Sequence, residues 1–277
     1  MTEFHLTAPY IFLLPLLGFA VSLIGTMAGL GGGFILVPIL IVLFPAAPPV
    51  VIASISLSVV FLNALSATAG NVRARRIDYR TAWLLMGAAL PAAIAGSLVS
   101  SLVQRDRYEV YFAIMLLIGA VYTLWRGMHA AADAQAGVHN PNREIVERKG
   151  PVYRFYVSTV LAGVISPLAG FLSSFFGIGG GVVHVPAMTF ILKMPPRVAG
   201  ATSLFVLVPT SLVGVLTHVV AGQYTEGWRR AGLLGLGAIV GAQIGVYLGG
   251  RVNQRVVMFL LAFALFAVGM RQLAAGI

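Results

Sequence analysis

The chain carries the same glycine-rich phrase twice, about half its length apart and both times within apolar sequence. The first copy runs from Gly29 to Pro38 and the second from Gly177 to Pro186, so each matched glycine and the proline are offset by 148 residues. Matched glycine breaks in two apolar halves are the best sequence pointer to the binding site of a transporter. The phrase therefore predicts two related halves whose breaks have a functional role.

Composition places the chain in a membrane. Only 9% of its residues are charged, against about 25% in a soluble globular domain. A transmembrane helix needs roughly 17–25 predominantly apolar residues, and the stretches without Asp, Glu, Lys or Arg are long enough to hold several. These stretches are 4–72, 81–104, 155–192, 198–225 and 231–250. We therefore expect a multi-pass integral membrane protein.

Charge and cysteine content narrow the functional classes. The net charge of +10 does not indicate a nucleic-acid partner, because the basic residues occupy short loops where the positive-inside rule expects them. Asp and Glu lie only at segment ends and in loops, which argues against a cation site in the membrane and suits an anion. There is no cysteine, no metal-ligand spacing and no nucleophile–base pair. We expect neither an enzyme nor a bound cofactor or metal.

Charges and turn residues divide the chain into two sets of five apolar segments. The first half, residues 1–127, holds segments 9–28, 34–45, 51–72, 80–102 and 108–127. The second half, residues 153–277, holds segments 153–175, 181–193, 199–221, 228–249 and 253–275. Residues 128–152 form the only long polar stretch and are expected to be a cytoplasmic linker. The predicted fold class is all-α and membrane-embedded, with two homologous halves and glycine-broken helices at the centre.

Two of these segments, 34–45 and 181–193, are short for membrane spans. Twelve helical residues reach about 18 Å, well under the roughly 30 Å hydrocarbon core. If all ten segments cross, the two repeats are inverted; if the short ones re-enter, eight cross and the repeats are parallel. The sequence leaves both topologies open, and we favour inverted repeats because transporters commonly use them. Both topologies place the arginines within residues 73–80 in the cytoplasm.

The glycine breaks have a chemical rationale. Unpaired backbone groups in lipid each cost several kcal/mol, so a break persists only where it is buried in protein or lines a cavity. A helix that begins after the break directs free N–H groups and its positive dipole end at whatever lies there, which suits an anion. The candidate binding glycines are Gly31, Gly32, Gly33, Gly179, Gly180 and Gly181. The alternative is that these glycines only allow close helix packing.

A few polar residues lie within the apolar segments and are candidates to line the site. Ser56 and Ser203 fall at equivalent places in the two halves. Thr210 follows a proline that is expected to kink its helix. His184 lies inside the second glycine phrase, where it would donate to an anion or carry a proton; a hydrogen bond to a neighbouring helix is an equally good explanation. Polar groups at membrane depth usually face a bundle interior or an aqueous cavity.

The two glycine phrases, together with residues 201–204 and the Thr217-His218 pair before Trp228, resemble the TauE/SafE-type sulfite exporter family. The resemblance covers essentially the whole chain and implies a bacterial inner-membrane permease for sulfite or a small organosulfur anion. Expected partners are that anion and membrane lipid, with a homodimer left open. The first half departs from the pattern, since Asn71 stands where the second has His218. The rival hypothesis is a membrane scaffold or enzyme subunit that does not transport.

Overall fold

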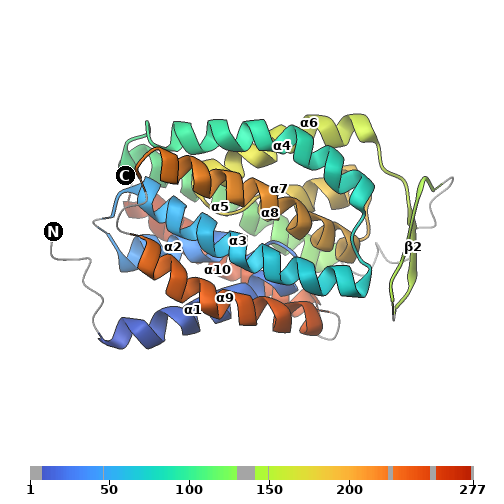
Figure 1. The fold of residues 1–277 in the computed structure, drawn as a ribbon, viewed down its shortest axis with the longest axis horizontal. Coiled ribbons are helices and arrows are strands. Elements are labelled where there is room, and N and C mark those ends of the chain that lie inside the picture. The colour runs from blue at the N-terminus through green and yellow to red at the C-terminus, as the bar shows by residue number, and fades with distance from the viewer. Residues whose placement is uncertain are drawn as a thin grey trace.

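The computed structural model describes residues 8–45, 47–129, 141–148, 150–223, 227–249 and 254–275. Within these ranges the chain is a bundle of helices with a small β hairpin at one end (Figure 1). The first half contains α1 (Ala8–Met27), α2 (Gly33–Leu43), α3 (Pro49–Ala74), α4 (Tyr79–Ser100) and α5 (Arg105–His129). The second half contains α6 (Thr159–Phe176), α7 (Gly181–Pro186), the π-helical turn η1 (Ala187–Ile191), α8 (Pro196–Val220), α9 (Trp228–Leu248) and α10 (Gln254–Ala275).

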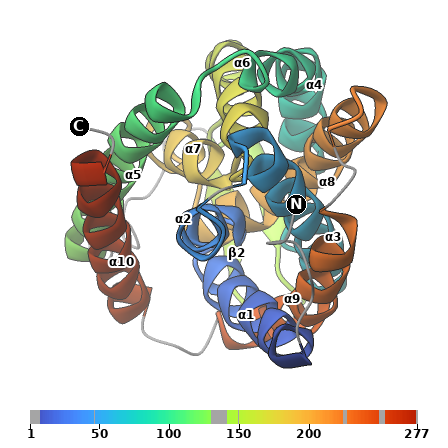
Figure 2. The same cartoon turned by 90° about the vertical axis from the view of Figure 1, so that its left-hand side faces the viewer.

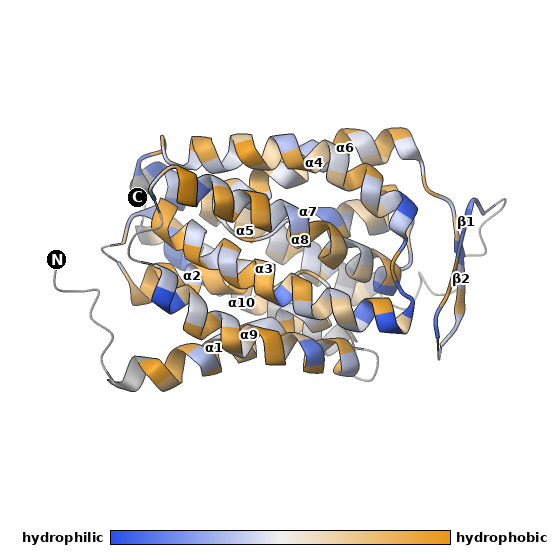
Figure 3. Cartoon of the chain, in the orientation of Figure 1, coloured by the Kyte–Doolittle hydropathy of each residue, from blue (hydrophilic) through white to orange (hydrophobic). Residues whose placement is uncertain are grey.

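The expected membrane character is confirmed. Six of the helices in the described part are long and apolar enough to span a bilayer, namely α3, α4, α5, α6, α8 and α9. Large apolar side chains such as Val121, Leu236 and Phe263 lie exposed on the outside of the bundle, where lipid rather than water is the favourable solvent. Figure 3 shows apolar residues along the helices and the most hydrophilic ones at the ends and on the hairpin.

The polar stretch between the halves contains a structure that the sequence analysis did not predict. Strand β1 (Arg143–Val146) pairs antiparallel with β2 (Val152–Phe155), so the described chain is not purely helical. The sixth segment begins as a helix at Thr159 and not at residue 153, because its first residues form β2. Of the expected linker 128–152, residues 130–140 and 149 lie outside the described residues.

The two short segments are helices of eleven residues or fewer, and each starts at a glycine break. Gly31 and Gly179 adopt left-handed backbone angles, with φ of +78° and +75°, a conformation that side chains with a Cβ disfavour. Helix α2 contains eleven residues, and α7 passes at Pro186 into the π-helical turn. A proline in the interior removes one backbone donor and deforms the helix.

The main contacts between helices are the same when the two halves are exchanged. Helix α1 packs on α9 while α6 packs on α4, and α3 packs on α9 while α8 packs on α4. The pairs α3–α8 and α5–α10 each bring a helix of the first half into contact with the equivalent helix of the second half. Figure 2, which looks along the bundle, shows α2 in its interior and α5 with α10 together at one side. Figure 1 shows α1 and α6 starting at opposite ends of the molecule.

Candidate functional site

The two glycine breaks touch each other inside the bundle. A Cβ at Gly33 would overlap the carbonyl oxygen of Ile178, and a Cβ at Gly181 would overlap that of Leu30. The two contacts are equivalent, because Ile178 and Gly181 are the counterparts of Leu30 and Gly33. The bare backbone at these two glycines is needed for so close an approach.

Helices α3 and α8 flank the place where the two breaks touch, which we call the crossing. They do so in a reciprocal way. A Cβ at Gly29 would lie 2.8 Å from the Cα of Gly200 on α8, and one at Gly177 would lie 2.5 Å from the Cα of Ala53 on α3. A Cβ at Gly179 would meet Leu207 and Val60, each at 2.7 Å. Close packing thus explains these glycines sterically.

Two predicted serines lie on the helix faces that meet the breaks. Ser56 stands between Ala53 and Val60 on α3, at the three- and four-residue spacing that keeps side chains on one helix face. Ser203 stands between Gly200 and Leu207 on α8 at the same spacing. Both serines are fully buried, and neither hydroxyl has a hydrogen-bond partner among the described residues.

Thr210 is less available than these serines. Its hydroxyl donates to the carbonyl of Val206 at 3.0 Å, within its own helix. It is buried and lies one turn beyond Leu207 on the α8 face that includes Ser203. Its oxygen can still accept a hydrogen bond, but its proton is already used, so it is a weaker donor to an anion than Ser56 or Ser203.

Two further serines border the breaks, and the sequence analysis missed them. The Ser22 hydroxyl lies 3.4 Å from where a Cβ of Gly32 would be, and the Ser173 Cβ lies 3.5 Å from that of Gly180. Both serines are buried, and neither hydroxyl finds a partner in the part of the chain that is described. Their counterparts in the other half are glycines, so the internal duplication gave no signal for them.

Free space beside the crossing is unequal on the two sides. A Cβ at Gly31 would meet no described atom within 4 Å, whereas its counterpart Gly179 is packed against α3 and α8. A side chain at Gly31 would therefore enter open space next to the first break.

His184 is held by a hydrogen-bond chain between helices. Its Nε2 lies 3.1 Å from the hydroxyl of Ser166 on α6, and that hydroxyl donates to the carbonyl of Leu85 on α4 at 2.6 Å. The hydroxyl proton is used, so Nε2 must be the donor to Ser166, and Nδ1 of the neutral ring is an acceptor. Nδ1 is buried beside Gly180 and has no partner within the described ranges. His184 can donate to an anion there only when both ring nitrogens carry protons.

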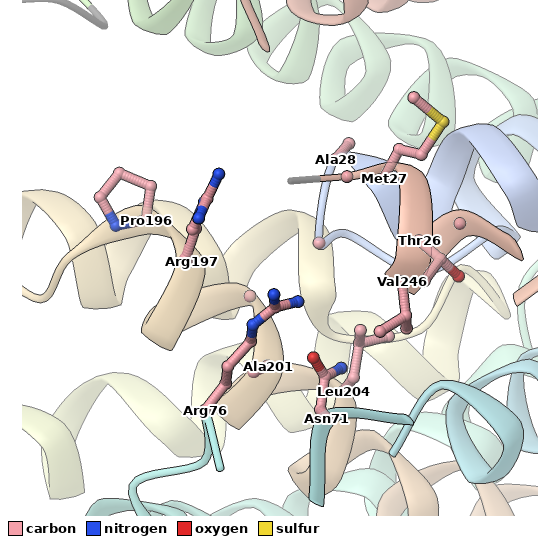
Figure 4. Close-up of a pocket in the computed structure, with 14 residues that line it drawn as sticks. Thr26, Met27, Ala28, Asn71, Arg76, Pro196, Arg197, Ala201, Leu204 and Val246 are labelled. Atoms are coloured by element: carbon pink, nitrogen blue, oxygen red, sulfur yellow. The ribbon is translucent and has the colours of Figure 1, made fainter. Parts of the chain in front are cut away.

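A second polar region lies at the hairpin end of the bundle. A cavity of about 50 Å³ reaches the first break at Gly29 and is lined by the side chains of Thr26, Asn71, Arg76 and Arg197. Figure 4 shows the guanidinium of Arg76 and the amide of Asn71 directed to the same side, with Arg197 nearby on the start of α8. None of the ten predicted site residues lines this cavity. From the sequence alone, the arginines within residues 73–80 indicate only the orientation of the chain in the membrane.

The comparisons with known proteins identify the family. The chain matches the family described as Sulfite exporter TauE/SafE over residues 14–271. This chain belongs to the TauE/SafE family. It is 29% identical over 272 residues to the probable membrane transporter protein YunE of Bacillus subtilis, covering 96% of this chain and 98% of the relative. A probable membrane transporter protein of Methanocaldococcus jannaschii is 30% identical over 228 residues, or 79% of this chain and 76% of the relative.

A plant relative bears the family's name. It is the Sulfite exporter TauE/SafE family protein 5 of Arabidopsis thaliana, 32% identical over 109 residues, which cover 39% of this chain and 23% of the relative. No solved structure matches the chain. The family and the relatives' names are those of membrane transporters and not of enzymes, as the sequence analysis expected.

Proposed function

We propose that this TauE/SafE protein is a secondary transporter that moves sulfite or a related small organosulfur anion across the bacterial inner membrane. The observation that carries the proposal is the crossing of the two glycine breaks, bordered by buried serine hydroxyls that have no partner among the described residues. A buried hydroxyl without a hydrogen bond costs about 1–3 kcal/mol, so each calls for an explanation. An oxyanion bound between them would accept those protons.

We also propose that the two halves are inverted repeats related by a pseudo-twofold axis in the membrane plane. The exchange-symmetric helix packing and the start of α1 and α6 at opposite ends support this arrangement. In this arrangement α2 and α7 start at the crossing and run towards opposite faces. Alternating access then follows from rocking one part of the protein against the other around a shared site.

The binding groups fit an anion that must also be released. Ser56 and Ser203 supply neutral donors from the two halves, and the glycines of both breaks let the backbone approach closely. An arginine in the middle of the membrane would hold the anion more strongly through charge-assisted hydrogen bonds and would therefore slow its release. His184 would add a donor only when protonated, so the anion and a proton would be bound together there. That requirement supplies a route for coupling transport to a proton gradient.

The rival function, a scaffold without transport, has one observation in its favour. Gly33, Gly181 and the glycines at 29, 177 and 179 are all needed for packing, as a scaffold would require. A proteoliposome uptake screen across sulfite, thiosulfate, sulfate, sulfoacetate and acetate separates the two functions. The transporter hypothesis expects uptake of at least one sulfur anion and none of acetate; a flat response to all five would favour the scaffold.

Replacing Ser203 by alanine should weaken anion affinity while the protein becomes slightly more stable. The hydroxyl is buried without a described partner, so its removal abolishes a desolvation cost of about 1–3 kcal/mol in the empty protein and a donor in the loaded one. The KM for uptake should rise severalfold, and the thermal unfolding midpoint in detergent should stay the same or increase. Thr217→Ala, which removes a hydroxyl bonded to Val213 of its own helix, is the control. An unchanged KM in Ser203→Ala would remove this serine from the site.

The hairpin end of the bundle should face the cytoplasm. Four arginines within residues 73–80 lie at this end, as the positive-inside rule requires. Arg75 is exposed there and the chain has no cysteine, so Arg75→Cys gives a single label. A membrane-impermeant maleimide should react with it only after the cells are permeabilised. Reaction in intact cells would reverse the proposed orientation.

A further inference from the structure

Arg76 and Arg197 line the cavity that reaches Gly29 from the hairpin end of the bundle, and we call this entrance the mouth. The hairpin places a carboxylate there. Glu147 directly follows β1, and its side chain is only 6% exposed. Its Oε1 accepts a hydrogen bond from Nε of Arg76 at 2.5 Å. The same oxygen also contacts Nη2 of that guanidinium. Its Oε2 lies 3.9 Å from a guanidinium nitrogen of Arg197. One carboxylate thus lies between the end of α3 and the start of α8.

The same two arginines connect an outer groove to the inner cavity. The groove has a volume of about 730 Å³ and includes the side chains of Arg73, Arg76, Arg148, Arg197 and Glu147. Arg76 and Arg197 also line the cavity that reaches Gly29. An anion drawn into the groove by its excess of positive charge would reach these two arginines before it reached the glycine break.

We propose that Arg76 and Arg197 form a binding site for a small oxyanion at this mouth, and that Glu147 is a tethered anion that competes for it. The inference rests on the proposed anion transport. Guanidinium groups bind planar carboxylates and tetrahedral oxyanions through the same donors, so the Glu147 carboxylate occupies the position of one substrate group. Asn71 and Thr26 extend the polar lining inwards from that position.

The charge balance and the turn geometry support exchange at this site. Glu147 brings one negative charge to two guanidiniums, and its Oε2 has no hydrogen bond within the described residues. A divalent oxyanion would bring two negative charges. The turn of the hairpin is shaped for this contact, since a Cβ at Gly150 would lie 2.6 Å from both Cδ and Oε2 of Glu147.

The test measures anion binding to the purified full chain without relying on transport. A ligand that binds only the folded protein raises its unfolding midpoint in a concentration-dependent way. Sodium sulfite is titrated at constant ionic strength, with sodium chloride as the balancing salt. Glu147→Gln should lower the half-saturating sulfite concentration roughly tenfold, and Arg76→Gln should raise it by at least as much, which is the range of a charge-assisted hydrogen bond.

Matched controls lie on the same hairpin. Glu144 and Arg154 form an exposed pair at 3.0 Å, so Glu144→Gln and Arg154→Gln make the same charge changes away from the mouth and should leave the titration unchanged. The amide oxygen introduced by Glu147→Gln can still contact Arg76 and Arg197. Glu147→Ala removes these contacts as well as the charge. The unfolding midpoint of Glu147→Ala should fall without sulfite and recover with it.

The inference would be overturned if Glu147→Gln and Glu144→Gln had equal half-saturating sulfite concentrations. It would also be overturned if sulfite did not raise the unfolding midpoint of either Glu147 variant. Uptake by the wild-type protein is measured separately. A protein that transports sulfite but shows no Glu147 effect would retain the proposed function and lose the mouth site. A protein that shows the Glu147 effect but moves no anion would retain the site and lose the function.

Discussion

Replacing Gly33 by alanine should abolish transport and reduce the yield of folded protein. The added Cβ would overlap the carbonyl oxygen of Ile178 and lie 2.6 Å from Val60. A backbone carbonyl cannot rotate away as a flexible side chain can, so we expect a destabilisation of about 3 kcal/mol or more, at the upper end of overpacking costs. Size-exclusion profiles and unfolding midpoints in detergent measure the effect. Gly181→Ala should behave in the same way, because its Cβ would overlap the carbonyl oxygen of Leu30.

The control for these variants is Gly163→Ala on α6. A Cβ at Gly163 would meet no described atom within 4 Å, and alanine favours the helix by about 1 kcal/mol over glycine. This variant should therefore be at least as stable as the wild type. Normal yield and normal uptake by Gly33→Ala would show that the two breaks do not pack as closely as the structure has them.

Sequence patterns predicted the helices well because apolar length and proline position largely determine them. The segment expected at 199–221 is α8, Pro196–Val220, whose first residue is a proline at the position where a missing N–H costs nothing. The sequence also predicted glycine-broken helices at the centre; in the structure the backbone at Gly33 lies against that of Ile178, and the backbone at Gly181 lies against that of Leu30.

The hairpin was missed for a physical reason. Its strands alternate charged or exposed residues with inward-facing ones such as Ile145 and Tyr153, which pack against the bundle end. Four residues are too few for that alternation to stand out, and the second strand, Val152–Phe155, merged with the apolar segment that follows. The mouth site was missed because Arg76 and Arg197 come together only when the end of α3 meets the start of α8, which no local pattern encodes.

The packing and binding explanations of the glycines differ most sharply at Gly31. Its φ is +78°, and a Cβ there would meet no described atom within 4 Å. Asparagine tolerates the left-handed conformation better than other residues with a side chain. Gly31→Asn should therefore still fold, with a slightly lower unfolding midpoint, while its amide fills the space beside the first break. If the anion passes through that space, uptake should fall at least tenfold.

Gly222→Asn is the matched control for this variant. Gly222 has a φ of +69°, and a Cβ there would also meet no described atom within 4 Å, but it lies after α8 and away from the breaks. Both variants pay a similar cost in backbone conformation, so a difference in uptake at equal amounts of folded protein reports on the space beside Gly31. Equal uptake would mean that Gly31 serves only the backbone turn. A selective loss in Gly31→Asn would place the anion next to the first break, since Gly179 and its neighbours leave no comparable room beside the second break.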